Sequence, residues 1–126
     1  MEQLAIEKRQ WRNYFDSFNK RNHSRLVRLE VSDETGSHQT VKKMPLSGVT
    51  LDKSGVEIML ENRRLDEGNH YTHIVKAPKN IIKDISNDGL DEILVIVDGS
   101  GFTTKLSIEH LPELRARRSI PGPRAA

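Results

Sequence analysis

The stretch EILVIVDGSGFTTKLSIE, residues 92–109, decides the fold. Its first arm, residues 92–98, is apolar on both faces of a strand, and the Gly-Ser-Gly at 99–101 predicts a hairpin turn. Its second arm alternates, which places four residues on one inner face: Phe102, Thr104, Leu106 and Ile108. A strand that is apolar on both faces needs cover on both sides, so another element must lie across it.

The N-terminal segment from about Gln3 to Lys20 predicts an amphipathic helix that supplies cover. Aromatic residues recur there at the spacing of one helix face: Trp11, Tyr14, Phe15 and Phe18. Leu4 lies seven residues before the first of them and extends the same face, while Lys8 and Arg12 fall on other faces. An aromatic stripe of this kind is typical of a core-facing helix, so we expect it to pack across residues 93–97.

The remaining segments change to a period of two, which predicts strands joined by short turns. They are residues 25–31, 39–44 continuing at 48–51 after Pro45, 56–61, 71–77, 81–85, 92–97 and 102–108. This pattern predicts an α+β fold, in which the N-terminal amphipathic helix packs on a curled, mostly antiparallel sheet of six or seven strands. We expect a roll or half-open barrel that forms a single domain over residues 1–111, followed by a flexible basic tail at 112–126.

Composition restricts the classes of protein. The 126 residues include no cysteine, which excludes disulfide scaffolds, thiolate zinc sites and cysteine nucleophiles. The N-terminal residues lack the apolar run of a secretory signal, and the longest apolar run, residues 93–97, is far too short to span a membrane. We therefore expect a cytoplasmic bacterial protein with no membrane partner.

Motif-like stretches have structural explanations. His70 and His73 look like a metal pair, but residues three apart on a strand point to opposite faces. The carboxylates fall mainly on outward strand positions and turns, where solvated charges belong. We therefore predict no catalytic residue, no metal site and no cofactor, and we single out His73 as the polar residue to watch.

The tail carries the net positive charge. Arg115, Arg117, Arg118 and Arg124 stand against one acidic residue, Glu113, whereas the preceding residues are nearly neutral. These arginines are candidate phosphate contacts for a nucleic acid. The alternative is a tail that only adds solubility.

The order and spacing of short motifs resemble a family of small uncharacterised bacterial proteins known only as a domain of unknown function. The resemblance spans roughly Lys8 to Ile108, so it leaves the arginine tail outside. Its motifs include Trp11-Arg12-x-Tyr14-Phe15-Asp16-x-Phe18, Pro45-Leu46-x-Gly48-Val49 and Thr72-His73-x-Val75-x-x-Pro78. The resemblance implies a compact α+β roll with an N-terminal helix, and it implies no activity.

Three hypotheses of function follow. The first is a small non-catalytic binding or interaction domain that takes a protein partner or a small ligand. The second is a nucleic-acid-associated protein that acts through the arginine tail. The third is a small enzyme that uses His73 and a nearby carboxylate. A concave pocket with convergent polar groups would favour a ligand.

Overall fold

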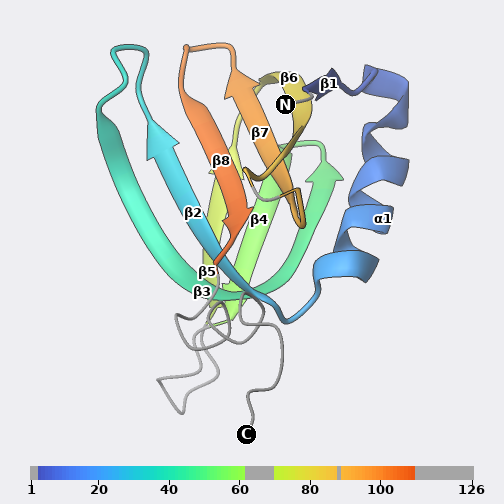
Figure 1. Cartoon of the computed structure of the whole chain (residues 1–126). Coiled ribbons are helices and arrows are strands. Elements are labelled where there is room, and N and C mark those ends of the chain that lie inside the picture. The colour runs from blue at the N-terminus through green and yellow to red at the C-terminus, as the bar shows by residue number, and fades with distance from the viewer. Residues whose placement is uncertain (1–2, 62–69, 88, 110–126) are drawn as a thin grey trace, which may run out of the picture.

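In the part of the chain that the structure describes, one α-helix packs on a curled antiparallel sheet of eight strands (Figure 1). The computed structural model describes residues 3–61, 70–87 and 89–109. The strands lie in the order β1-β6-β7-β8-β2-β3-β4-β5, every pairing is antiparallel, and the sheet is not closed into a barrel. The predicted α+β class with a curled, open antiparallel sheet is confirmed, and the sheet has eight strands where six or seven were expected.

The elements follow one another in a simple order. The N-terminal part contains β1 (Leu4–Ala5), the 3-10 helix η1 (Lys8–Gln10) and α1 (Trp11–Asn22). The first half of the sheet then contains β2 (Leu26–Ser32), β3 (His38–Asp52), β4 (Gly55–Glu61) and β5 (His70–Val75). The second half contains β6 (Pro78–Ile85), β7 (Glu92–Asp98) and β8 (Thr103–Ile108).

The extra strand corrects the predicted start of the helix. The helix begins at Trp11 rather than near Gln3, and Leu4 belongs to β1, where it pairs with Lys83 of β6. Leu4 is 60% exposed, so it does not continue the buried helix face. Its segment is extended because the edge of β6 offers backbone partners, and the Ile6 N–H donates to the Ile81 oxygen at 2.8 Å.

The long strand β3 bends and pairs first with β2 and then with β4. Its first part pairs with β2 as far as Pro45, and its second part pairs with β4 from Leu46 onward. Proline lacks a backbone donor, which suits the point where one ladder ends. The strand that the sequence split at Pro45 is therefore continuous.

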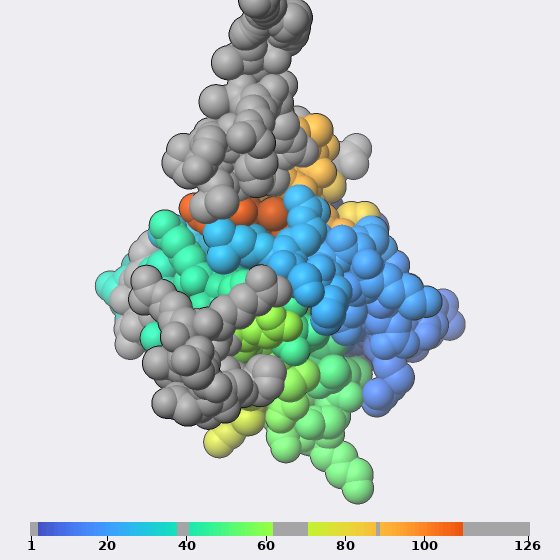
Figure 2. Space-filling view, turned by 90° about the horizontal axis from the view of Figure 1, so that it is seen from below, coloured from blue at the N-terminus to red at the C-terminus, as the bar shows by residue number. Residues whose placement is uncertain are grey.

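Helix α1 covers the edge of β3 that this bend leaves open (Figures 1 and 2). The Asn19 side chain pairs with the Val49 backbone: its Nδ2 donates to the Val49 oxygen at 2.9 Å, and its Oδ1 accepts from the Val49 N–H at 2.8 Å. Nearer the start of the helix, Arg12 Nη1 donates to the Leu51 oxygen at 3.2 Å. The helix thus supplies hydrogen-bond partners that another strand would otherwise provide.

The aromatic helix face and the strand pair contribute to one hydrophobic core, while the strand that α1 contacts most widely is β3. Trp11, Phe15 and Phe18 are buried in one cluster with Leu94 and Ile96 of β7. Apolar burial is worth roughly 2–3 kcal/mol for such a side chain, so the burial of these aromatic residues is a major source of stability. Phe102 is the exception among the predicted inner-face residues, because it precedes β8 and is 36% exposed.

The two faces of β7 are unequal. Leu94 and Ile96 on the inner face are fully buried, whereas Ile93, Val95 and Val97 on the outer face are only half-buried. The apolar run predicts that both faces of β7 are covered. Among the residues that the structure describes, the inner face is covered fully and the outer face only in part.

Candidate functional site

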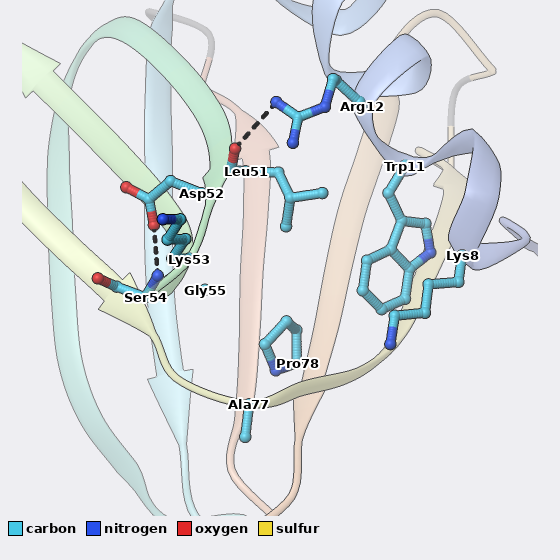
Figure 3. Close-up of a pocket in the computed structure, with 10 residues that line it drawn as sticks. All are labelled: Lys8, Trp11, Arg12, Leu51, Asp52, Lys53, Ser54, Gly55, Ala77 and Pro78. Carbon is cyan, nitrogen blue, oxygen red and sulfur yellow. Dashed lines mark hydrogen bonds between the residues drawn. The ribbon is translucent and has the colours of Figure 1, made fainter.

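Three segments that are distant in sequence surround a cavity of about 640 Å³ (Figure 3). We call it the helix–hairpin cavity. It is lined by Lys8 of η1, by Trp11 and Arg12 of α1, by residues 51–55 of the β3–β4 hairpin, and by Ala77 and Pro78 between β5 and β6. Its size lies in the range of about 300–1,000 Å³ that is usual for small-molecule sites.

The indole of Trp11 forms one wall. Its Nε1–H donates to the Ile6 oxygen at 2.9 Å, which fixes the ring between the helix and the segment that follows β1. Trp11 is only 4% exposed, so the ring presents a small apolar surface to the cavity. The Lys8 ammonium lies 6.0 Å from the centre of this ring.

The β3–β4 hairpin forms the opposite wall, and a glycine sets its position. Asp52 Oδ1 accepts the Ser54 N–H at 2.7 Å, which stabilises the turn. Gly55 has a φ of 129°, and a Cβ placed there would lie 2.1 Å from the Val75 oxygen. Only glycine lets the hairpin approach β5 so closely.

The link between β5 and β6 completes the cavity. Ala77 has a φ of 51°, which is uncommon for a residue with a side chain, and it stands directly before Pro78, where β6 begins. The Gly99 N–H donates to the Ala77 oxygen at 3.0 Å, so the β7–β8 turn supports this link. The predicted Gly-Ser-Gly turn therefore has a structural role beside the cavity.

Positive charge predominates around the helix–hairpin cavity. Lys8, Arg12 and Lys53 contribute three cations, and Asp52 is the one carboxylate among its described lining residues. Within the part of the chain that the structure describes, none of the three cations forms an ion pair with a carboxylate. Arg12 is instead tied to a backbone oxygen. The arrangement suits a negatively charged ligand better than a cation.

Paired charges elsewhere on α1 provide a contrast. Arg21 forms an ion pair with Glu92 at 2.7 Å, and the Tyr14 hydroxyl donates to the same carboxylate at 2.7 Å. Burial by itself raises the pKa of Glu92, but these two hydrogen bonds, together with the positive charges of Arg21 and Lys83, outweigh it and lower the pKa below its usual value. Burial and the bond to Glu92 raise the pKa of Tyr14. This cluster ties α1 to β7 and is internally satisfied, so it has a structural role.

His73 lies away from the helix–hairpin cavity. It lies opposite the fully buried Ile58 in the β4–β5 ladder, so its side chain points into the roll, and its Nε2 lies 3.2 Å from Thr104 Oγ1 of β8. Burial lowers the pKa of His73, and the negative charge of Asp98 partly opposes that effect. Asp98 Oδ1 accepts backbone N–H groups of the β7–β8 turn, so this carboxylate already has a structural task.

The structure does not test the predicted nucleic-acid contacts of the tail. Arg115, Arg117, Arg118 and Arg124 lie outside the described residues. Among the residues that are described, no group of three or more His, Asp or Glu side chains is placed to hold a metal ion. No helix in the same ranges is long and apolar enough to cross a membrane.

The fold and the cavity define an α+β protein with a helix-covered, open antiparallel sheet and a basic, ligand-sized cavity at the start of its helix. The chain belongs to the family of unknown function DUF5335, which matches residues 2–117. The match is wider than the resemblance seen in the motifs, and it includes Arg115 and Arg117. Searches of curated proteins and of solved structures found no match.

Sequence patterns did not predict this cavity. Lys8 and Arg12 read as solvent-facing positions of a helix, and residues 52–55 read as an ordinary hairpin turn. One signal was present: Lys8 and Arg12 flank the single tryptophan, and cations beside an aromatic ring are frequent in binding sites.

Proposed function

We propose that this protein is a non-catalytic domain that binds a small molecule in the helix–hairpin cavity. The observation that carries the proposal is a ligand-sized cavity whose apolar walls are surrounded by three cations that form no ion pair with any described carboxylate. Concave, mostly apolar sites with a few polar groups are the usual form of small-molecule sites. Because three separate segments line the cavity, a bound ligand would contact all three at once.

The lining residues support binding rather than chemistry. General acid–base catalysis needs a group whose pKa is suited to proton transfer and that lies within reach of the substrate. Asp52 is the one described carboxylate in the lining, and one of its oxygens already accepts the Ser54 N–H. The lysines and the arginine are suited to hold a charge in place.

A fragment screen tests this proposal directly. Trp11 is the single tryptophan of the chain, so its indole N–H gives one assignable signal in a ¹H–¹⁵N NMR spectrum. We expect some fragments to shift this signal while most of the spectrum stays unchanged. A diverse screen at millimolar concentration that never moves the Trp11 signal would refute ligand binding here. Turnover of a bound compound that is lost in Asp52→Asn would refute the non-catalytic part.

The arginine tail supports a second candidate, a nucleic-acid-associated protein. Four arginines that each contact a phosphate would make binding weaken steeply with salt, with a slope of about −3.6 on a log–log plot. We expect a chain cut after Leu111 to lose binding to mixed-sequence DNA or RNA. Unchanged binding after that cut, or no binding at low salt, would remove this candidate. A third candidate, an enzyme acting through His73, predicts turnover that is lost in His73→Gln.

We further propose that the protein works in the bacterial cytoplasm. The absence of cysteine among its 126 residues is compatible with a reducing compartment. Fractionation of cells that express a tagged full-length chain tests this, and recovery in a membrane or secreted fraction would contradict it.

A further inference from the structure

The cations of the helix–hairpin cavity and its apolar walls lie on the same ligand-sized space, and together they specify a class of ligand. We propose that the cavity takes an organic anion with a flat apolar body, such as an aromatic carboxylate. This proposal rests on the proposed function, because it names the ligand class of the same site.

The anionic end of the ligand would be held by Arg12. Its Nη1 is fixed by the Leu51 oxygen at 3.2 Å, so the guanidinium is held beside the cavity rather than free to rotate away. Figure 3 shows a second terminal nitrogen of Arg12 pointing toward the hollow. A guanidinium edge donates to oxyanions with a fixed geometry, and Lys53 adds a second positive charge from the hairpin.

The apolar body of the ligand would lie against the Trp11 ring, the Leu51 side chain and Pro78. These three come from α1, β3 and β6, and they surround the same hollow (Figure 3). Because Trp11 is only 4% exposed, it offers the ligand a small aromatic surface, against which a flat ring packs more closely than a branched aliphatic body. The ligand therefore has its charge near Arg12 and its ring toward Pro78.

Charge balance excludes the other ligand types. Three cations and one carboxylate leave a net charge of +2 around the cavity. A cationic ligand would be repelled, and a neutral one would displace water from the cations without replacing those interactions. An anion compensates for the water that it displaces.

A pair of probes that differ only in charge tests the proposal. The full-length protein is titrated with 2-naphthoate and, separately, with 2-naphthalenemethanol, and the Trp11 indole N–H signal is followed by ¹H–¹⁵N NMR. We expect the carboxylate to bind at least about tenfold more tightly than the alcohol. Because partly exposed charges are screened by salt, we expect the difference to shrink at high ionic strength.

Variants assign the effect to named residues. Lys53→Gln and Arg12→Gln should each weaken 2-naphthoate by about two- to fivefold, the range for one partly exposed ion pair, and leave the alcohol unchanged. Lys20→Gln is the matched control, because Lys20 is an exposed cation on α1 that does not line the cavity. Lys53 lies in an exposed turn, so its variant should fold even if the Arg12 variant does not.

The outcomes separate this proposal from the proposed function. Equal affinity for the two probes, or an equal loss in Lys20→Gln, would overturn the anionic ligand class while leaving a ligand site at Trp11. No movement of the Trp11 signal with either probe, together with an empty fragment screen, would remove both.

Discussion

Replacing Asn19 by alanine tests how α1 is attached to the sheet. In the folded protein this amide makes two hydrogen bonds to the backbone of Val49, at 2.9 and 2.8 Å. Val49 itself is 1% exposed. The Asn19→Ala variant therefore leaves one buried N–H and one buried carbonyl without their partners.

The expected loss of stability follows from those two groups. A buried polar group that loses its partner costs about 1–3 kcal/mol, so the pair gives about 2–6 kcal/mol, toward the lower end if water enters. Alanine also favours a helix over asparagine by roughly 0.5 kcal/mol, which offsets a little of the loss. Small domains are stable by about 5–15 kcal/mol, so the variant should be visibly weakened.

Asn13→Ala provides the matched control, because Asn13 is exposed on the same helix. It has the same change in helix propensity without the buried partners. Urea unfolding followed by circular dichroism gives the free energy of unfolding for each variant. If Asn19→Ala is less than about 1 kcal/mol less stable than Asn13→Ala, the side chain does not hold the edge of β3, and this reasoning is wrong.

Three further predictions concern the core, the interior histidine and the hairpin. Ile96→Asn should unfold the protein, because it removes about 2–5 kcal/mol of packing and buries an amide. Val95→Asn, on the half-buried outer face, should stay folded, as measured by circular dichroism. Unfolding of both variants would contradict the unequal burial of the two faces of β7. Because burial lowers the pKa of His73, the unfolded chain takes up a proton first as pH falls below about 6.5, so urea unfolding should show stability that is constant above that value and declines below it. His73→Gln should lose that decline, and an identical pH profile in the variant would rule out His73 as its source. Gly55→Ala should cost more than about 3 kcal/mol or prevent folding, since its Cβ would meet a backbone oxygen at 2.1 Å. Gly36→Ala, at a positive φ of 90° with open space around it, should cost only about 1–2 kcal/mol; equal losses would show that the contact with the Val75 oxygen does not set the cost.

Periodicity predicted most of the secondary structure because burial enforces it. The spacing of Trp11, Phe15 and Phe18 identifies the buried helix face, and alternation identifies Val27, Leu29 and Val31 as inward residues of β2. These patterns are local, because apolar residues recur at the period of the helix or strand whose one face is buried.

The start of the helix and the strand order could not be read in the same way. Leu4 fits the helix pattern, but the backbone edge of β6 pairs with its segment, and that edge lies almost eighty residues away in sequence. Likewise, nothing local in β8 shows that it pairs with β2 as well as with β7.

The candidate site was hidden for a related reason. Its lining comes from residues near 10, 53 and 77, and each of these segments has an ordinary local explanation as helix, turn or link. A cavity becomes visible only once Gly55 and Ala77 have brought the hairpin and the link together. Sequence patterns report which side chains are buried, and they do not report where packing leaves space.

The position of β8 has a consequence for how the protein is made. This strand, the last of those that the structure describes, lies between β7 and β2 in the middle of the sheet, so β1, β6 and β7 join the other described strands only through it. On a ribosome, β2 to β5 emerge early, but β2 has one edge without a partner until residues 103–108 leave the exit tunnel. We therefore expect nascent chains that stop before β8 to be open to chaperones and proteases, and the complete domain to form only after synthesis has passed that strand.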